Sequence, residues 1–149
     1  MSLSNEDRIN QIEKKGSLTL ENGHIVSVDL SNRMISDILL VNLNQLITLR
    51  ELYLGGTEIT DLGLGYLEGL ENLIWLELSD TEITDAGMRH VATMSPLKSL
   101  FLYGCKVTDT SVAYLKELIN LEELGLDDTQ ITQDGLFQLR VLLPNARID

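Results

Sequence analysis

Apolar residues return at the same places every 24 residues from about Ile25 to the end of the chain. Two leucines separated by one other residue mark each of four units: Leu52/Leu54, Leu76/Leu78, Leu100/Leu102 and Leu124/Leu126. This alternation is typical of a half-buried β-strand. Further apolar residues follow at helical spacing, as Leu64, Leu67 and Leu70 do after Leu54. Each unit therefore predicts a short strand, a turn and a short helix.

The period divides most of the chain into five full units and a partial one: 25–48, 49–72, 73–96, 97–120, 121–144 and 145–149. A single unit is too small to bury its own apolar face, so neighbouring units must stack to enclose a common core. The sequence thus predicts an α/β solenoid of one domain. Its strands would form one curved parallel sheet, with the helices on the convex side.

Residues 1–24 fall outside this period and predict an N-terminal cap. A helix is expected over residues 4–15, with Ile12 facing inwards. Asn22-Gly23 lies between two apolar runs, which predicts a hairpin with a type I′ turn. Helix and hairpin together would cover the first edge of the sheet.

Threonine and aspartate recur where each helix is expected to begin, as in Ile59-Thr60-Asp61. Thr60 or Asp61 is a suitable N-cap, because a side-chain oxygen accepts from the unpaired N–H groups there. The same interpretation applies to the whole aspartate column. We favour it over a ladder of calcium ligands, since the column spreads over separate helix starts. Its members are Asp37, Asp61, Asp85 and Asp109.

The full unit reads L-x-x-L-x-L-x-x-T-x-I-T-D-x-G-L. This motif resembles the leucine-rich repeat family, in particular the cysteine-containing, ITDxGL-type repeats of F-box partner proteins and of many bacterial repeat proteins. The resemblance implies the solenoid fold and an adaptor, scaffold or assembly role. The motif is highly specific for the fold but gives almost no information about function.

The chain carries 11 basic and 23 acidic side chains, a net charge of −12. This balance argues against nucleic acid and anionic membranes as partners. One cysteine excludes an intrachain disulfide, and two histidines leave little for a transition metal. Nucleotide-loop, nucleophile-elbow and zinc-protease motifs are not found, so we expect no catalytic, cofactor or metal site. A polar start and only short aliphatic runs predict a cytoplasmic protein.

The positions between the strand leucines should point away from the core, onto the concave face of the sheet. Fifteen such positions hold four of the seven aromatic residues, far more than random placement would give. These are Tyr53, Trp75, Phe101 and Tyr103. The same positions in the five full units carry acids but no lysine or arginine. Glu51, Glu77, Glu123 and Asp127 are predicted to form an acidic rim around the rings.

Three interpretations of this surface are open. The rings could be ordinary strand residues that cover one another. They could be the anchors of a protein-binding site whose partner is a basic, extended segment. The third is a sugar-hydrolysing enzyme, with Glu51 and Glu77, or Glu77 and Asp127, as paired carboxylates. An open sheet gives no deep pocket that would exclude water or raise the pKa of one carboxyl group, so the enzyme is the weakest of the three interpretations. We predict a non-catalytic protein-interaction module, with self-association through this patch or the C-terminal edge as the alternative.

Overall fold

The computed structural model describes residues 5–149, in which seven strands form one sheet in chain order. β1 and β2 pair antiparallel, and every later strand pairs parallel with the one before it. The strands are β1 (Ser17–Glu21), β2 (His24–Asp29), β3 (Glu51–Tyr53), β4 (Trp75–Glu77), β5 (Ser99–Phe101), β6 (Glu123–Gly125) and β7 (Arg147–Ile148). The parallel register places Leu52, Leu76 and Leu100 side by side. The repeat seen in the sequence is therefore the strand-to-strand step of the sheet.

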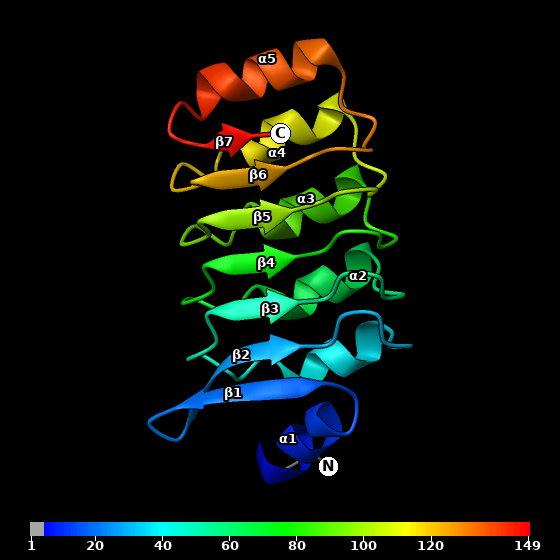
Figure 1. The fold of residues 1–149 in the computed structure, drawn as a ribbon, viewed down its shortest axis with the longest axis vertical. Coiled ribbons are helices and arrows are strands. Elements are labelled where there is room, and N and C mark those ends of the chain that lie inside the picture. The colour runs from blue at the N-terminus through cyan, green and yellow to red at the C-terminus, as the bar shows by residue number, and fades with distance from the viewer. Residues whose placement is uncertain (1–4) are drawn as a thin grey trace.

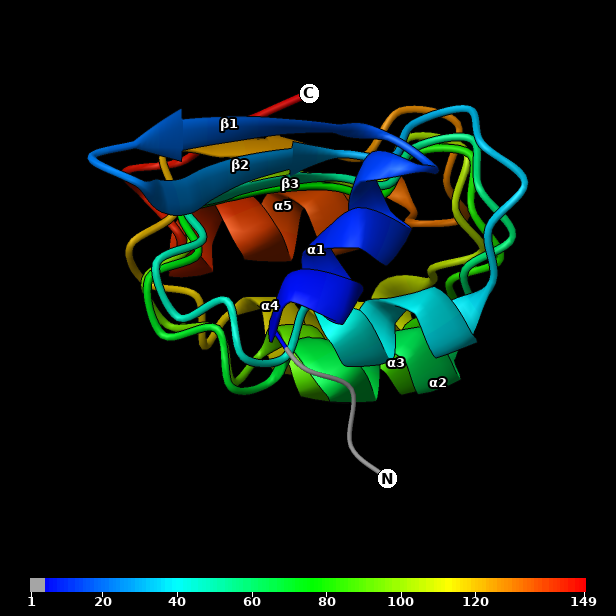
Figure 2. The same cartoon turned by 90° about the horizontal axis from the view of Figure 1, so that it is seen from below.

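The helices of the repeats all lie on one side of this sheet, which leaves its other side uncovered (Figures 1 and 2). They are η1 (Asp37–Asn42), α2 (Asp61–Leu64), η2 (Gly65–Leu67), α3 (Asp85–Val91), η3 (Asp109–Ser111), α4 (Val112–Leu115) and α5 (Gln133–Leu142). We call the uncovered side the open face. The predicted sequence of strand, turn and helix is confirmed in all five units, although the first helix is 3₁₀ and two others are part 3₁₀.

A single apolar core runs along the stack between the sheet and the helices. Leu52, Leu76, Leu100 and Leu124 are all fully buried in it. Each such side chain contributes about 1.5–3 kcal/mol relative to leaving it exposed. Because this ladder fixes which side of each strand faces inwards, it also fixes which residues reach the open face.

Threonine, and not aspartate, is the N-cap of the helical segment in the second to fifth repeats, whereas η1 of the first repeat begins after Ser36. The Thr84 hydroxyl accepts the N–H of Ala86, while Asp85 is already the first residue of α3. The Asp61 carboxylate instead accepts both the N–H and the hydroxyl of Thr84 in the next unit, at 2.8 and 2.6 Å. The sequence interpretation of the aspartates as N-caps is therefore corrected. They hold the capping threonine of the following unit and tie the two units together.

The N-terminal cap forms as predicted within the described residues. Helix α1 (Asn5–Glu13) packs on the end of the stack, where Ile12 is fully buried. Asn22 and Gly23 have φ angles of 51° and 79°, the positive values that a type I′ hairpin turn requires. The expected helix start at residue 4 lies outside the described residues. At the other end, the short β7 pairs with β6 and completes the sheet.

Candidate functional site

Four aromatic side chains form a continuous row on the open face. Ring centroids lie 6.0 Å apart for Tyr53 and Trp75, 5.0 Å for Trp75 and Phe101, and 5.8 Å for Phe101 and Tyr103. All three contacts are tilted, which is a favourable arrangement for aromatic pairs. We call these four residues the ring array. It joins β3, β4 and β5.

Every ring of the array is half-buried, because the rings cover one another and the strands beneath them. The Tyr103 ring lies directly over Gly125 of the next strand, where a Cβ atom would overlap it. A glycine at this outward position of β6 therefore lets the ring lie across the sheet. The array presents a partly covered aromatic surface, in place of four separate side chains standing in solvent.

Two of the predicted acids are held beside the rings by hydrogen bonds. The Tyr53 hydroxyl donates to Glu51 at 3.4 Å, and the Ser99 hydroxyl donates to Glu123 at 3.3 Å. Asp127 is exposed after β6. Because these groups are charged and close to the array, they make the surroundings of the rings strongly negative.

Glu77 lies among the rings and not at their rim. In the sheet register it has Tyr53 on one side and Phe101 on the other, and Trp75 precedes it by two residues on β4. Its Oε1 accepts the N–H of Ser79 at 2.7 Å, which fixes the side chain. The predicted acidic rim therefore does not include Glu77, which lies in the middle of the array.

The two tyrosine hydroxyls of the array are donors at neutral pH. Burial raises the pKa of Tyr53, and the nearby Glu51 carboxylate raises it further. Burial and the Asp149 carboxylate likewise raise the pKa of Tyr103, whose hydroxyl donates to Asp149 at 3.2 Å. Neither hydroxyl ionises under ordinary conditions.

Two polar atoms on the outward side of β4 and the turn after it are covered without a hydrogen-bond partner among the described residues. They are Nε1 of Trp75 and Oγ of Ser79. A covered donor without an acceptor costs roughly 1–3 kcal/mol, and such groups are rare in folded proteins. They belong to the residues two before and two after Glu77 in the chain.

The sixth, partial unit adds two residues that the sequence prediction missed. Arg147 pairs in register with Glu123, and Asp149 bonds to Tyr103. With Phe101 these four residues line a hollow of about 200 Å³ at the C-terminal end of the open face. Adding one more period of 24 to positions 123 and 125 would have identified both residues.

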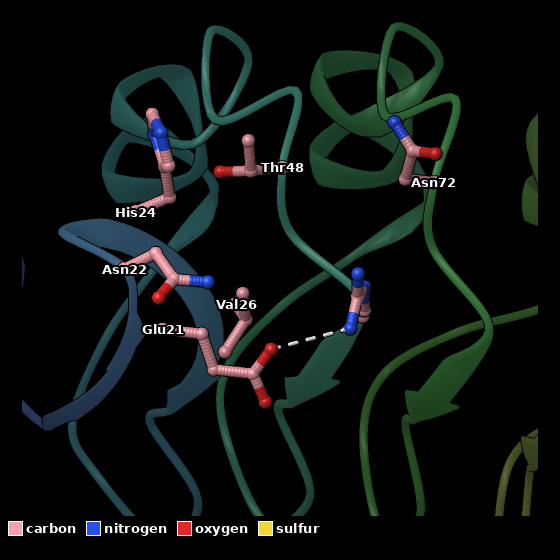
Figure 3. A pocket seen from close by; sticks show the side chains of 7 residues that line it. Glu21, Asn22, His24, Val26, Thr48 and Asn72 are labelled. Carbon is pink, nitrogen blue, oxygen red and sulfur yellow. Dashed lines mark hydrogen bonds and ion pairs between the residues drawn. The ribbon is translucent and has the colours of Figure 1, made fainter.

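A second hollow of about 230 Å³ lies at the other end of the sheet, beside the hairpin turn (Figure 3). Most of its polar groups are bonded to other parts of the fold. Thr48 donates to the carbonyl of Ile25 at 2.8 Å and Asn72 to that of Ile47 at 2.7 Å. Glu21 pairs with Arg50 at 3.3 Å. These bonds tie the hairpin to the first repeats, which accounts for the polar lining.

The alternative of paired catalytic carboxylates gains no geometric support. In the sheet register the neighbours of Glu77 are Tyr53 and Phe101, and those of Glu51 are Ser27 and Trp75, so neither acid has a carboxylate as its register partner. Among residues 5–149, no three His, Cys, Asp or Glu side chains are placed to hold a metal ion. Within the same residues, no helix has the length and apolar character needed to cross a bilayer.

Residues 47–107 match the sequence profile of the leucine rich repeat family. Among solved structures, a leucine-rich-repeat protein of Leptospira interrogans is 30% identical over 73% of this chain, with a TM-score of 0.56. An internalin of Listeria monocytogenes is 23% identical over 82%, with a TM-score of 0.53. The chain spans only 27% and 39% of these two proteins.

The actin-binding site 2 of leiomodin-1 is similar over a larger share of both chains. The match covers 97% of this chain and 90% of the leiomodin-1 chain, with a TM-score of 0.64 and 14% sequence identity. No curated protein matches the sequence. The chain therefore has the leucine-rich-repeat fold, and its residues 47–107 match the leucine rich repeat family.

Proposed function

We propose that this chain is a non-catalytic protein-interaction module that binds its partner on the open face, with the ring array at the centre of the contact. The observation that carries this proposal is the array itself. It is a continuous aromatic surface across three strands, on the side of the sheet that no helix covers. Rigid aromatic side chains at the centre of a preformed surface are the usual anchors of protein interfaces.

The fold supports this assignment in general terms. Leucine-rich-repeat domains are typically protein-interaction modules and are generally non-catalytic. Stacked repeats give a long, continuous surface that accommodates an extended partner. The solved leiomodin-1 structure is named as an actin-binding site, so this fold serves a protein contact there.

Charge selects the partner. The net charge of −12 and the carboxylates of Glu51, Glu77, Glu123 and Asp127 around the array favour a basic segment. Such complementarity raises the association rate and excludes acidic partners. We therefore infer a basic, extended stretch of protein as the ligand.

The test is a selection of random linear peptides on the wild-type protein and on the Trp75→Ala/Phe101→Ala variant. Peptides recovered from the wild type should carry more lysine and arginine than aspartate and glutamate. They should bind the double variant at least about tenfold more weakly, because two anchors are lost. The circular dichroism of the variant should match the wild type, since both side chains lie outside the core.

The matched control is Leu62→Ala/Ile119→Ala, which removes two side chains that are 75% and 71% exposed elsewhere. It should bind the selected peptides as the wild type does. Peptides that bind the ring-array variant equally well, or that carry no excess of positive charge, would contradict the proposal. If the ring-array variant unfolds, the rings belong to the core and the site is wrong.

A second candidate function, self-association, is favoured by the last helix. Phe137, Val141 and Leu142 of α5 are 69%, 62% and 45% exposed and line one shallow hollow. An exposed apolar stripe of this kind is typical of a contact with another protein surface. A second copy of the chain would bury it at the C-terminal end of the stack.

Light scattering during size-exclusion chromatography tests this second candidate. Wild type should show a mass that rises towards a dimer with concentration, and Phe137→Ser/Val141→Ser should remain a monomer. The control Ile47→Ser/Leu62→Ser, altered at two other exposed apolar positions, should dimerise normally. A wild-type monomer at every concentration would exclude self-association.

A further inference from the structure

An acid with an aromatic register neighbour on both adjacent strands lies at the middle of the ring array, and this acid is Glu77. Adjacent strands lie about 4.8 Å apart, so the register places Tyr53 and Phe101 immediately beside Glu77. Trp75, on the same strand, contacts both flanking rings, with centroids 6.0 and 5.0 Å away. Glu77 thus has an aromatic neighbour on three sides.

The Glu77 carboxylate is held in place and still has capacity to accept hydrogen bonds. Its Oε1 takes the Ser79 N–H, and its Oε2 lies over Gly55, where a side chain would overlap it. A carboxylate has about four acceptor positions, of which this bond uses one. The space above Gly55 and the Ser79 bond therefore fix where the Glu77 carboxylate lies.

The aromatic residues around Glu77, together with its carboxylate, suit the binding of a guanidinium group. A guanidinium is planar, stacks on aromatic faces and donates two parallel hydrogen bonds to one carboxylate. It is also less strongly hydrated than an ammonium, so bringing it between rings costs less. A lysine would satisfy the charge, but not the flat aromatic walls.

Aromatic rings, acids and an arginine already lie together at the C-terminal end of the open face. There the Arg147 guanidinium pairs with Asp149 at 3.4 Å, in a hollow lined by Phe101, Tyr103 and Glu123. Arg147 is the one cation among the outward positions of the described strands β3 to β7. The central position, around Glu77, has the rings and the acid but no cation of its own.

We propose that the open face recognises an arginine side chain of its partner, seated against Trp75 and Phe101 and paired with Glu77. This inference rests on the proposed function and narrows its basic segment to one that carries arginine.

Trp75 is the only tryptophan in the chain, so its fluorescence reports on this position alone. The probes are three glycine-serine peptides of equal length that differ only in repeated arginine, lysine or citrulline. Citrulline keeps the shape of arginine without the charge. The arginine peptide should change the emission saturably and bind about tenfold more tightly than the lysine peptide, with citrulline weakest.

Glu77→Gln should weaken the arginine peptide more than the lysine peptide and so reduce this preference, because the amide keeps the Ser79 bond but has neither the charge nor the second oxygen that a guanidinium pairs with. Glu82→Gln, at an exposed position paired with Lys106 outside the array, should retain it. Isothermal titration on Trp75→Ala should show the arginine peptide bound at least about tenfold more weakly.

Equal binding of arginine and lysine peptides to the wild type, with both lost in Trp75→Ala, would overturn the arginine inference and leave the basic partner standing. If the citrulline peptide binds as well as the arginine peptide, or if no peptide changes the emission, both proposals are wrong. A neutral oligosaccharide that binds at Trp75 in place of the peptides would overturn both as well.

Discussion

Four aspartates at the helix starts connect each repeat to the next by paired hydrogen bonds. Asp85 accepts the N–H of Thr108 at 2.8 Å and its hydroxyl at 2.6 Å, and Ser111 also donates to it. Burial alone would raise the pKa of the Asp85 carboxyl, but the bonds from Ser111 and Thr108 outweigh burial and lower it. The carboxylate form of Asp85 therefore stabilises the fold.

The stability contributed by Asp85 should depend on pH. A carboxyl whose pKa is lower when folded contributes fully above its unfolded pKa of about 3.9, and the contribution is lost as pH falls through the folded pKa. Asp85→Asn should thus cost about 1–3 kcal/mol in urea unfolding at pH 7, and less at pH 3. The exposed Glu71→Gln should cost little at either pH. An equal cost of Asp85→Asn at both pH values would contradict this role.

Glycine at the third helical position leaves room for the aspartate of the preceding unit. A Cβ atom on Gly87 would overlap the Asp61 carboxylate and lie 2.9 Å from Leu64 Cδ1. Gly87→Ala should therefore destabilise the protein by about 1–3 kcal/mol. Gly69→Ala is the control, because its Cβ would meet only the Asn44 carbonyl oxygen at 3.7 Å, and it should change stability by less than about 0.5 kcal/mol. Thermal unfolding of both variants measures these changes in stability. Equal losses of stability in the two variants would contradict the steric role of Gly87.

The strands and the cap follow from local sequence, but the exact form of the helices does not. Period-2 leucines predict each strand, and Asn22-Gly23 predicts the hairpin turn because both residues tolerate positive φ. The short helices divide into α and 3₁₀ turns, and α5 has ten residues. Inter-unit packing decides these details, so they are not visible in one unit's sequence.

Helix α1 should contribute to stability as a cap through the buried side chain of Ile12. Ile12 is fully buried against the first repeat, whereas Ile38 of η1 is 71% exposed. Ile12→Ala should cost about 2–5 kcal/mol in urea unfolding, because it leaves a cavity under the cap. Ile38→Ala should cost less than about 0.5 kcal/mol. A small effect at Ile12 would show that the repeats do not need the cap.

We propose that the cap and the five repeats form one cooperative domain, because the apolar core runs unbroken from Ile12 to Ile148. Repeats that contact only their neighbours depend on such continuity for joint unfolding. The surface of this domain was predictable in part. Alternation along the strands identifies the ring array, but the half-burial of its rings, the place of Glu77 among them and the bond of Tyr103 to Asp149 depend on cross-strand packing.

The most direct measurement of partner binding is an NMR map of backbone amide shifts as a selected peptide is added. We expect the largest changes on the open face, in residues 51–55, 75–79 and 99–103. The amides of α2, α3 and α4 on the opposite side should change little. Changes concentrated on those helices or on α5, with the three strands unaffected, would show that the ring array is not the binding surface.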